Sequence, residues 1–230
     1  NRMKDLKNCH NSGNCPQFVV SYSGGKDSTL ALYKAMQEGT AVALISMLRT
    51  EDGLAGAHAV PKTILQAQAE AMGIPLLTFT TDWNQYEAGL LDCLKRAKSM
   101  GAETLVTGDI DLPEQNCWYE NVTKKAGVSL FVPLWQWDRK KVVAEFLKLG
   151  FVSKIVSVDP SQGMQQSDLG RILTTEYLAE LEDRGIDCCG ESGEFHTIVL
   201  DEPIFQKPLK VRKGKQFSIG RNLCIELEVF

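Results

Sequence analysis

Short apolar runs alternate with longer amphipathic stretches through the first half of the chain. The runs have the length of a buried strand, and in the stretches between them apolar residues recur at helical spacing, as Leu30, Tyr33 and Met36 do. The predicted strands are 17–23, 41–48, 74–81 and 103–110, and the predicted helices are 26–39, 61–73 and 85–101. This alternation predicts βαβ units, and hence an α/β fold with a parallel sheet covered on both faces.

The second half of the chain has a less regular pattern. It predicts strands at 129–135 and 153–159, a helix at 138–150 with Asp138 as its N-cap, a helix at 167–185 capped by Ser167, and two or three β segments in 208–230. We therefore predict a polar tail at 1–16, a doubly wound domain at 17–135 and a smaller α+β subdomain at 136–230.

A turn that contains two glycines joins the first predicted strand to the first predicted helix, with the sequence Ser23-Gly24-Gly25-Lys26-Asp27-Ser28. It would lie at the carboxyl end of a parallel strand, where α/β sheets bind ligands. Glycine allows close backbone approach, and the free N–H groups of a helix start bind phosphate. A lysine in the first turn is unfavourable unless an anion lies beside it. Asp27 is a candidate ligand for Mg²⁺ held against phosphates, and the Ser23 and Ser28 hydroxyls are further donors.

Composition and charge narrow the class of protein. The chain has 230 residues, 43% of them hydrophobic, which is typical of a soluble globular protein. The net charge of −4 does not favour nucleic acid or a membrane as partner, and no apolar run approaches the roughly 20 residues of a membrane span. Seven cysteines without a signal-peptide core predict a reduced, cytoplasmic protein. Cys9, His10 and Cys15 lack the spacing of a common zinc site, so we predict a polar tail there.

In its strand–turn–helix setting, Ser-Gly-Gly-Lys-Asp-Ser resembles the PP-loop of the ATP pyrophosphatases, the adenine nucleotide α-hydrolase-like superfamily, whose fold is HUP-like and Rossmann-type. The resemblance implies that the loop grips the β- and γ-phosphates of ATP while a substrate oxygen attacks the α-phosphate, which gives an adenylate and pyrophosphate. Lys26 would stabilise the leaving group, and Asp27 and Asp109 would bind Mg²⁺. Adenine is expected near Ser46, Met47 and Leu48.

Three later blocks narrow the resemblance: VTGDIDL at 106–112, VPLWQWDRKKVVAEFLKLGF at 132–151 and GIDCCGESGEFHTIVLDEPIF at 185–205. With the first loop, and in this order, they resemble the diphthine–ammonia ligase family from about Gln17 onward. In that family the carboxylate of diphthine, on a translation elongation factor, is activated and ammonia displaces AMP. The amino-acid sequences of these blocks are more similar to those of a bacterial branch of that family. The acceptor therefore stays open between a protein side chain and a small carboxylate.

Two stretches of the chain depart from the family pattern. After GDI, Gln115 and Glu120 remain, but the arginines that the resemblance leads us to expect between them are absent. The late block reads GESGEFHT where GEGGEYET is more usual. These departures affect the expected acceptor more than the expected ATP chemistry.

Candidates for the reaction lie after the fourth predicted strand and in the late block. Gly108 and Asp109 end that strand, so Asp109 is expected to face the same crevice as the loop and to bind Mg²⁺ or orient the acceptor; the other interpretation is a turn cap. Glu191 and Glu194 lie on either side of Ser192, and two carboxylates on a tight turn repel each other unless a cation, an amine or N–H groups share the site. They would bind ammonia or deprotonate ammonium; the other interpretation is a solvated turn.

The residues are assigned to roles as follows. The catalytic residues are Lys26, Asp27, Asp109 and Glu194; the nucleotide-binding residues are Ser23, Gly24, Gly25, Lys26, Asp27, Ser28, Ser46, Met47, Leu48 and Gly108; and the substrate-binding residues are His58, Glu120, Glu191 and Ser192. We expect packing roles for His196 and Cys189. Trp118, Trp135 and Trp137 either line an acceptor pocket or pack in the core or at an interface.

The sequence therefore predicts an ATP-dependent, AMP-forming ligase or amidase that uses ATP, Mg²⁺ and ammonia. Its acceptor and its oligomeric state, a homodimer included, stay open. The rival hypotheses on the same fold are a non-catalytic nucleotide sensor and a nucleotide α-hydrolase. An RNA thiolase is disfavoured, because those proteins carry cysteine pairs and basic surfaces, whereas this chain has no CxxC and is acidic.

Overall fold

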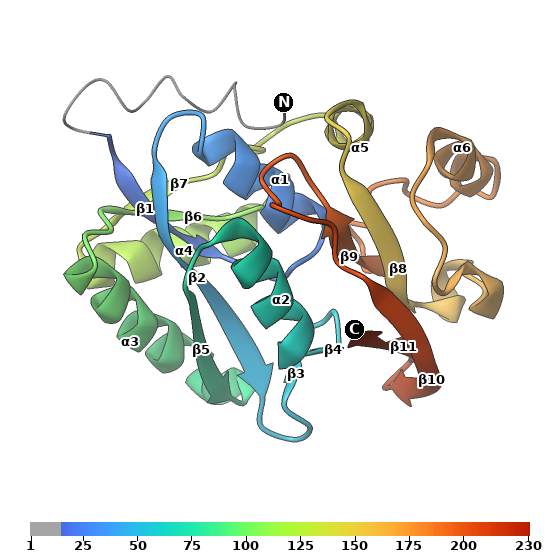
Figure 1. Ribbon diagram of the computed structural model, residues 1–230, viewed down its shortest axis with the longest axis horizontal. Helices are drawn as coiled ribbons and strands as arrows, with labels where there is room; N and C mark the ends of the chain where they lie inside the picture. The colour runs from blue at the N-terminus through green and yellow to red at the C-terminus, as the bar shows by residue number, and fades with distance from the viewer. Residues whose placement is uncertain (1–14) are drawn as a thin grey trace.

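The computed structural model describes residues 15–230, and a parallel sheet forms the centre of its N-terminal part (Figure 1). The parallel strands are β1 (Gln17–Ser21), β2 (Thr40–Arg49), β5 (Leu76–Thr81), β6 (Thr104–Val106) and β7 (Ser129–Phe131). They lie in the order β5-β2-β1-β6-β7, so the chain starts in the middle and winds first to one edge and then to the other. This is the predicted doubly wound α/β fold, in which ligands bind where the strand order reverses. Two short strands, β3 (Leu54–Ala55) and β4 (Val60–Pro61), extend the sheet at the end of β2.

Helices cover both faces of this sheet because its strands are apolar on both sides. Val19 and Val20 are neighbours in β1 and are both fully buried, but they belong to opposite faces. Val20 packs with α1 (Lys26–Ala35) and α2 (Lys62–Met72), and Val19 packs with α3 (Tyr86–Ser99) and α4 (Pro113–Ala126). A short 3₁₀ turn, η2 (Trp83–Gln85), precedes α3.

A second, antiparallel sheet forms the C-terminal part (right side of Figure 1). Its strands are β8 (Val152–Val158), β9 (Phe195–Asp201), β10 (Val211–Ile219) and β11 (Asn222–Val229), in the order β10-β11-β8-β9. The accompanying helices are α5 (Arg139–Lys148) and α6 (Thr175–Asp183), with the 3₁₀ turns η3 (Pro160–Gln162) and η4 (Gln166–Asp168). Ile198 and Val199 of β9 share a buried core with Leu30 and Leu65, so the second sheet packs against α1 and α2.

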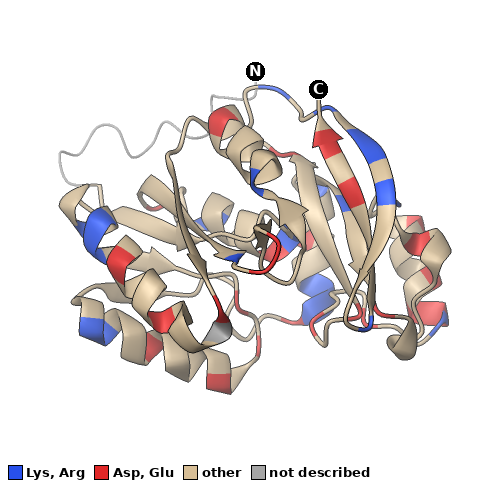
Figure 2. Ribbon diagram, turned by 90° about the horizontal axis from the view of Figure 1, so that it is seen from below, with Lys and Arg blue, Asp and Glu red and all other residues tan. Residues whose placement is uncertain are grey.

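Charged side chains of both signs cover the C-terminal sheet. Figure 2 shows basic residues on β10, which carries Arg212, Lys213 and Lys215, beside acidic residues on the adjacent strand β11. Arg212 binds Glu228 across the two strands at 2.7 Å. No helix within residues 15–230 is long and apolar enough to cross a membrane.

Most elements of the first half were predicted, but α4 was not. Its 14 residues bury only Tyr119, Val122 and Thr123, so the apolar face is too narrow to show as a helical pattern. Its ends do carry ordinary signals, since Pro113 stands in the first turn and Gly127 is left-handed at the C-cap. The strand before it, β6, ends at Val106 rather than at residue 110.

The prediction of one helix over 167–185, capped by Ser167, is wrong. The chain forms only the short turn η4 there, and α6 begins at Thr175 with Thr174 as its N-cap. The reason is Asp168, whose buried carboxylate binds Arg184 at 2.8 Å and holds this segment away from a helix. Gly170 then turns with φ +78°, and Ile172 pairs with β8.

Asp138 is the N-cap of α5, as predicted, and accepts a hydrogen bond from the backbone N–H of Lys141. The predicted β segments at the end of the chain are the two strands β10 and β11. Cys9, His10 and most of the predicted tail lie outside the described residues. The division at residue 135 stays a prediction.

Candidate active site

The turn between β1 and α1 is held tightly by segments distant in the sequence. Gly24 has φ +78°, and a Cβ there would lie 2.5 Å from Oε1 of Gln68. Its carbonyl accepts hydrogen bonds from the backbone N–H of Val199 in β9 at 2.9 Å and from Nε2 of Gln68 at 3.0 Å. A Cβ on Gly25 would lie 2.4 Å from the His58 ring. Both positions therefore require glycine, and the turn is fixed by α2 and by the C-terminal sheet.

Side-chain hydroxyl groups accept hydrogen bonds from the backbone N–H groups around the start of α1. The backbone N–H of Ser23 donates to Oγ of Ser28 at 3.2 Å, and that of Gly25 donates to Oγ of Ser23 at 3.3 Å. The backbone N–H of Lys26 donates to Oγ1 of Thr197 at 3.1 Å. Such N–H groups bind phosphate well, and the side chains that now accept from them are hydroxyls that rotate easily.

Lys26 is the cation of this site. Its side chain is buried, with Nζ 2.6 Å from Oδ2 of Asp27 and 3.8 Å from Oε1 of Glu191. Burial alone lowers the pKa of this ammonium, but the neighbouring acidic groups, Asp27 foremost, outweigh burial and hold the pKa above its ordinary value. Lys26 is therefore charged at neutral pH.

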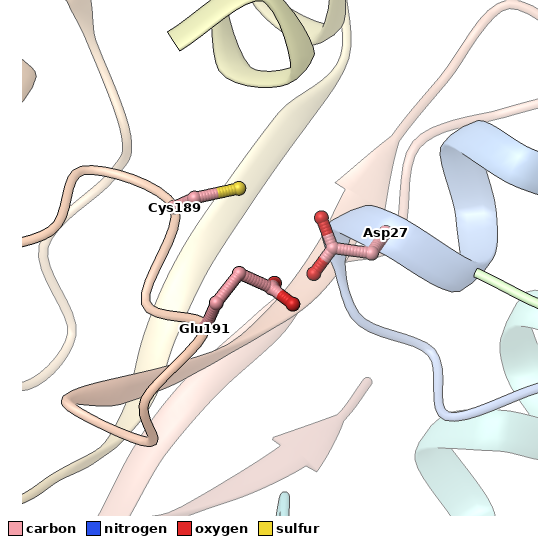
Figure 3. Close-up of side chains that lie close together, drawn as sticks. All are labelled: Asp27, Cys189 and Glu191. Carbon is pink, nitrogen blue, oxygen red and sulfur yellow. The ribbon is translucent and has the colours of Figure 1, made fainter. Parts of the chain in front are cut away.

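Glu191 lies opposite Asp27, on the glycine-rich loop that precedes β9. Figure 3 shows the two carboxylates pointing toward one another, with the Cys189 thiol nearby. Burial, and then the negative charge of Asp27, raise the pKa of Glu191 to about 7, although Lys26 and Arg139 oppose the rise. Glu191 can therefore gain or lose a proton near neutral pH.

The acidic groups around Asp27 fit a divalent cation in part. Asp27, Cys189 and Glu191 each offer a donor atom, and the three atoms lie within 4.8 Å of one another. Oδ1 of Asp27 is buried and has no hydrogen-bond partner in the described part of the chain, so it is available to a ligand. Carboxylate oxygens suit Mg²⁺, whereas burial raises the pKa of the Cys189 thiol and keeps it protonated. The carboxylates fit Mg²⁺ and the thiol does not.

Asp109 faces the same cavity from the end of β6. Burial raises its pKa, and the charge of Asp27 acts in the same direction. A cation between Asp27 and Asp109 would relieve this repulsion. Gly108 allows the close approach, since a Cβ there would lie 2.7 Å from the backbone nitrogen of Ser28.

These groups line one cavity of about 390 Å³ at the carboxyl ends of the parallel strands. Its apolar wall consists of Ile45, Met47, Phe79, Tyr86 and Leu90. Its polar wall consists of Asp109, Gln115 and Tyr119, and the hydroxyl of Tyr119 lies 3.0 Å from Oγ of Ser21. The volume lies in the range of small-molecule sites.

The structure brings together most of the predicted site residues. The cavity is lined by Ser23, Lys26, Asp27, Ser28, Met47, His58, Gly108, Asp109 and Glu191. The remaining residues lie elsewhere. Ser46 is buried and donates to the carbonyl of Tyr22, Leu48 belongs to the core, and Glu120 is exposed and accepts from Asn116. Ser192 is exposed, and the buried Glu194 accepts from the backbone N–H of Ser192 at 3.0 Å.

His58 and His196 pack against each other, Trp118 and Trp137 pack against other side chains, and Cys189 is buried. Nδ1–H of His58 donates to the carbonyl of Thr197 at 2.9 Å, and its ring lies 4.8 Å from that of His196. Burial lowers both pKa values, that of His196 to about 3, so both rings are neutral at pH 7. Trp118 packs between Tyr86 and Tyr119, and the ring of Trp137 lies 4.1 Å from Nζ of Lys141. Neither Trp118, Trp135 nor Trp137 lines the cavity.

Several site residues were not singled out from the sequence: Gln68, Phe79, Tyr86, Tyr119 and Thr197. Thr197 had a signal, since it ends the GESGEFHT stretch. Tyr119 had none, because its helix was not predicted. Phe79 and Tyr86 come from segments that were predicted only as a strand and a helix.

The fold and the cavity define a doubly wound α/β enzyme whose site lies at the switch of strand order, completed by loops of a second sheet. A family model described as "Diphthamide synthase N-terminal domain" matches residues 17–130, and one described as "Diphthamide synthase C-terminal domain" matches residues 138–227. The chain therefore belongs to the diphthamide synthase family, and it is a ligase.

Curated relatives carry the name diphthine–ammonia ligase. The protein of Rattus norvegicus is 28% identical over 214 residues, which cover 82% of this chain and 80% of the relative. The protein of Danio rerio is 28% identical over 218 residues, which cover 84% and 85%, and that of Homo sapiens is 26% identical. A solved chain titled as a predicted subunit of tRNA methyltransferase from Methanocaldococcus jannaschii aligns with a TM-score of 0.45 at 15% identity, over 83% of this chain and 98% of that one.

Proposed function

We propose that this protein is an ATP-dependent, AMP-forming ligase that joins ammonia to a carboxylate. The observation that carries the proposal is the buried, charged Lys26 in the first turn of α1, facing the cavity beside Asp27, whose Oδ1 is unpartnered among the described residues. Asp27 pairs with this cation at the helix start, and the triphosphate of ATP would supply a second anion from the cavity side. The family named above consists of relatives called diphthine–ammonia ligase, which fits this chemistry.

The reaction has two steps. A carboxylate oxygen of the acceptor attacks the α-phosphorus of ATP, and the bond to the β-phosphate oxygen breaks, which releases pyrophosphate. Ammonia then attacks the carbonyl carbon of the adenylate, and AMP leaves with the electron pair of the C–O bond. Lys26 and the N–H groups of the Gly24-Gly25 turn hold the charge that develops on pyrophosphate.

Asp27 and Asp109 are the proposed ligands of Mg²⁺, which would neutralise phosphate charge when bound. The apolar wall next to Met47 is the proposed adenine site. Met47 lines the cavity while Ser46 and Leu48 do not, so of the three residues expected near adenine only Met47 is proposed to contact it.

Glu191 is the proposed base. Its carboxyl lies on the cavity wall and its pKa of about 7 lets it take a proton from ammonium or from attacking ammonia. Glu194 instead holds the turn of the glycine-rich loop through the N–H of Ser192. These positions favour Glu191 for catalysis and Glu194 for positioning, whereas the sequence assigned Glu194 to catalysis and Glu191 to substrate binding.

The proposed acceptor is a carboxylate such as that of diphthine, the substrate in the name of the relatives. Helix α4 carries Asn116 and Trp118 where the resemblance led us to expect arginines, and no arginine of the described residues lines the cavity. The walls offer Gln115 and Tyr119 as hydrogen-bond donors instead. A cytoplasmic location belongs to the same proposal, because a translation factor would be the acceptor.

The test is ATP–pyrophosphate exchange with Mg²⁺, with diphthine-bearing elongation factor and with fractions of cell extract as sources of acceptor. We expect exchange that depends on one source and falls about 100-fold or more in Lys26→Ala. Lys34→Ala is the matched control, because Lys34 lies in the same helix but binds Glu145 outside the cavity. Tight ATP binding with neither exchange nor AMP from any source would contradict the proposal and favour a nucleotide sensor. AMP release that needs no acceptor would favour an α-hydrolase.

A further inference from the structure

One arginine outside the cavity joins the two loops that carry its acidic residues. Arg139 is the first residue of α5. Its Nε and Nη2 donate to the two carboxylate oxygens of Asp111 at 2.7 and 2.9 Å. Its Nη1 donates to Oδ2 of Asp187 at 2.5 Å. A guanidinium can bind both carboxylates at once because its donors have a fixed planar arrangement, which lysine lacks.

The Asp111 side of this bridge fixes the segment that carries Asp109. Asp111 lies two residues beyond Asp109, in the connection from β6 to α4. The same connection is held a second time, since the backbone N–H of Gln136 donates to the carbonyl of Ile110 at 2.7 Å. Gln136 has φ +59°, a conformation that a non-glycine residue adopts only when its surroundings enforce it. The start of the C-terminal part is therefore fastened to this segment at two points.

The Asp187 side of the bridge orders the glycine-rich loop. The carboxylate of Asp187 accepts hydrogen bonds from the backbone N–H of Cys189 at 2.9 Å and from that of Glu191 at 3.3 Å. These bonds set the backbone from which the Glu191 side chain reaches toward Lys26 and Asp27. Without Arg139, Asp187 would lose its only salt-bridge partner among residues 15–230 and would be free to turn toward solvent, since its side chain is 19% exposed.

We propose that Arg139 is a positioning residue that fixes the Asp109 segment and the Glu191 loop relative to each other across the cavity. This inference rests on the proposed function, because it assigns the two carboxylates to one reaction. Arg139 is not among the residues that line the cavity, so it acts through Asp111 and Asp187. A misplacement of about 1 Å in such a site reduces the rate by up to roughly 100-fold.

The test compares Arg139→Gln and Arg139→Lys with Arg212→Gln, which breaks a similar arginine–glutamate pair on the distant strand β10. We expect kcat for AMP formation to fall about 10- to 100-fold in R139Q, with KM for ATP changed less than about threefold. R139K, which binds one carboxylate rather than two, should lie between R139Q and the wild type. Because R139Q already breaks the contact with Asp187 that D187N weakens, R139Q/D187N should be no slower than the slower single variant by more than about threefold.

Hydrogen exchange of the loop 187–194 provides a readout that needs no catalysis. Its N–H groups should exchange at least about tenfold faster in R139Q than in R212Q, because the bonds to Asp187 loosen. If the wild-type protein shows no ATP–pyrophosphate exchange, the proposed function fails. Hydrogen exchange then still tests whether Arg139 orders the loop. Unchanged loop protection, or faster loop exchange with kcat unaltered, would overturn the inference. A double variant in which the two losses multiply would overturn it as well.

Discussion

Glu202 is a buried acid outside the cavity, and it makes the stability of the fold depend on pH. The residue follows β9, is 1% exposed, and neither oxygen of its carboxyl has a hydrogen-bond partner in the part of the chain that the structure describes. Burial raises its pKa well above the ordinary value of 4.5, and the charge of Asp201 raises it further. The carboxyl is therefore protonated in the folded chain at pH values where the unfolded chain has already lost the proton.

The sign and the size of the effect follow from this difference in proton binding. Above pH 4.5 the folded state binds more protons than the unfolded state, so the free energy of unfolding falls as pH rises. The stabilising contribution is fully present below pH 4.5 and is lost progressively up to the pKa of the folded state. The loss is about 1.4 kcal/mol per pH unit, or about 2.8 kcal/mol over two units within that window.

Glu202→Gln removes the titration but keeps the shape of the side chain. We expect urea unfolding at pH 5.5, 6.5 and 7.5 to show that the wild type loses stability relative to the variant as pH rises, by up to about 1.4 kcal/mol per unit while the folded carboxyl keeps its proton. The buried amide N–H₂ group of the variant also costs stability, but this cost is the same at every pH. The test is therefore the slope of the unfolding free energy against pH. Glu103→Gln changes an exposed carboxyl and is the matched control. A difference between wild type and E202Q that stays flat across this range would refute the assignment of a neutral, buried acid.

Two further predictions concern the cavity. Gly25→Ala places a Cβ 2.4 Å from the His58 ring and 3.0 Å from the carbonyl of Thr197, so it should lower the free energy of unfolding by about 1–3 kcal/mol and weaken ATP binding in calorimetry. The control is Gly53→Ala, with φ +70° and no atom within 4 Å of the added Cβ, which should cost stability without affecting ATP binding. Equal effects of the two variants on binding would contradict the prediction. If Glu191 is a base with a pKa of about 7, kcat/KM should rise with pH through pH 7, and Glu191→Gln should lose this rise along with most of the activity. A rise that persists in E191Q would assign the titration to another group.

The parallel sheet could be predicted from the sequence because each strand is a continuous apolar run and each helix has a clear apolar face. Helix α4 was not predicted because only three of its residues are buried. It lies beside α3 on the same face of the sheet. The long helix predicted over 167–185 failed for a different reason. A buried ion pair between Asp168 and Arg184 overrides local helix propensity there, and no local pattern reveals such a contact.

Within the site, the residues that could be predicted are those at the ends of predicted strands. Lys26, Asp27 and Asp109 follow β1 and β6, and parallel strands bring such positions to one edge. Glu191 could be found from its glycine-rich loop, but the different roles of Glu191 and Glu194 could not be predicted. The Glu191 side chain lines the cavity, whereas that of Glu194 turns into the loop. The apolar wall and Tyr119 depend on how α3 and α4 lie over the sheet, which the sequence pattern leaves open.

The proposed phosphate loop is not complete within the N-terminal part of the chain. Its two glycines lie between β1 and α1, but Val199 of β9 donates to the carbonyl of Gly24, and Thr197 of the same strand accepts from the N–H of Lys26. The carbonyl of Thr197 also holds His58 over Gly25. The shape of the loop therefore depends on β9, although Thr197 lies 171 positions after Lys26 in the sequence. A movement of β9 would therefore also disturb the N–H groups proposed to bind phosphate, so the proposed nucleotide and acceptor sites are mechanically coupled.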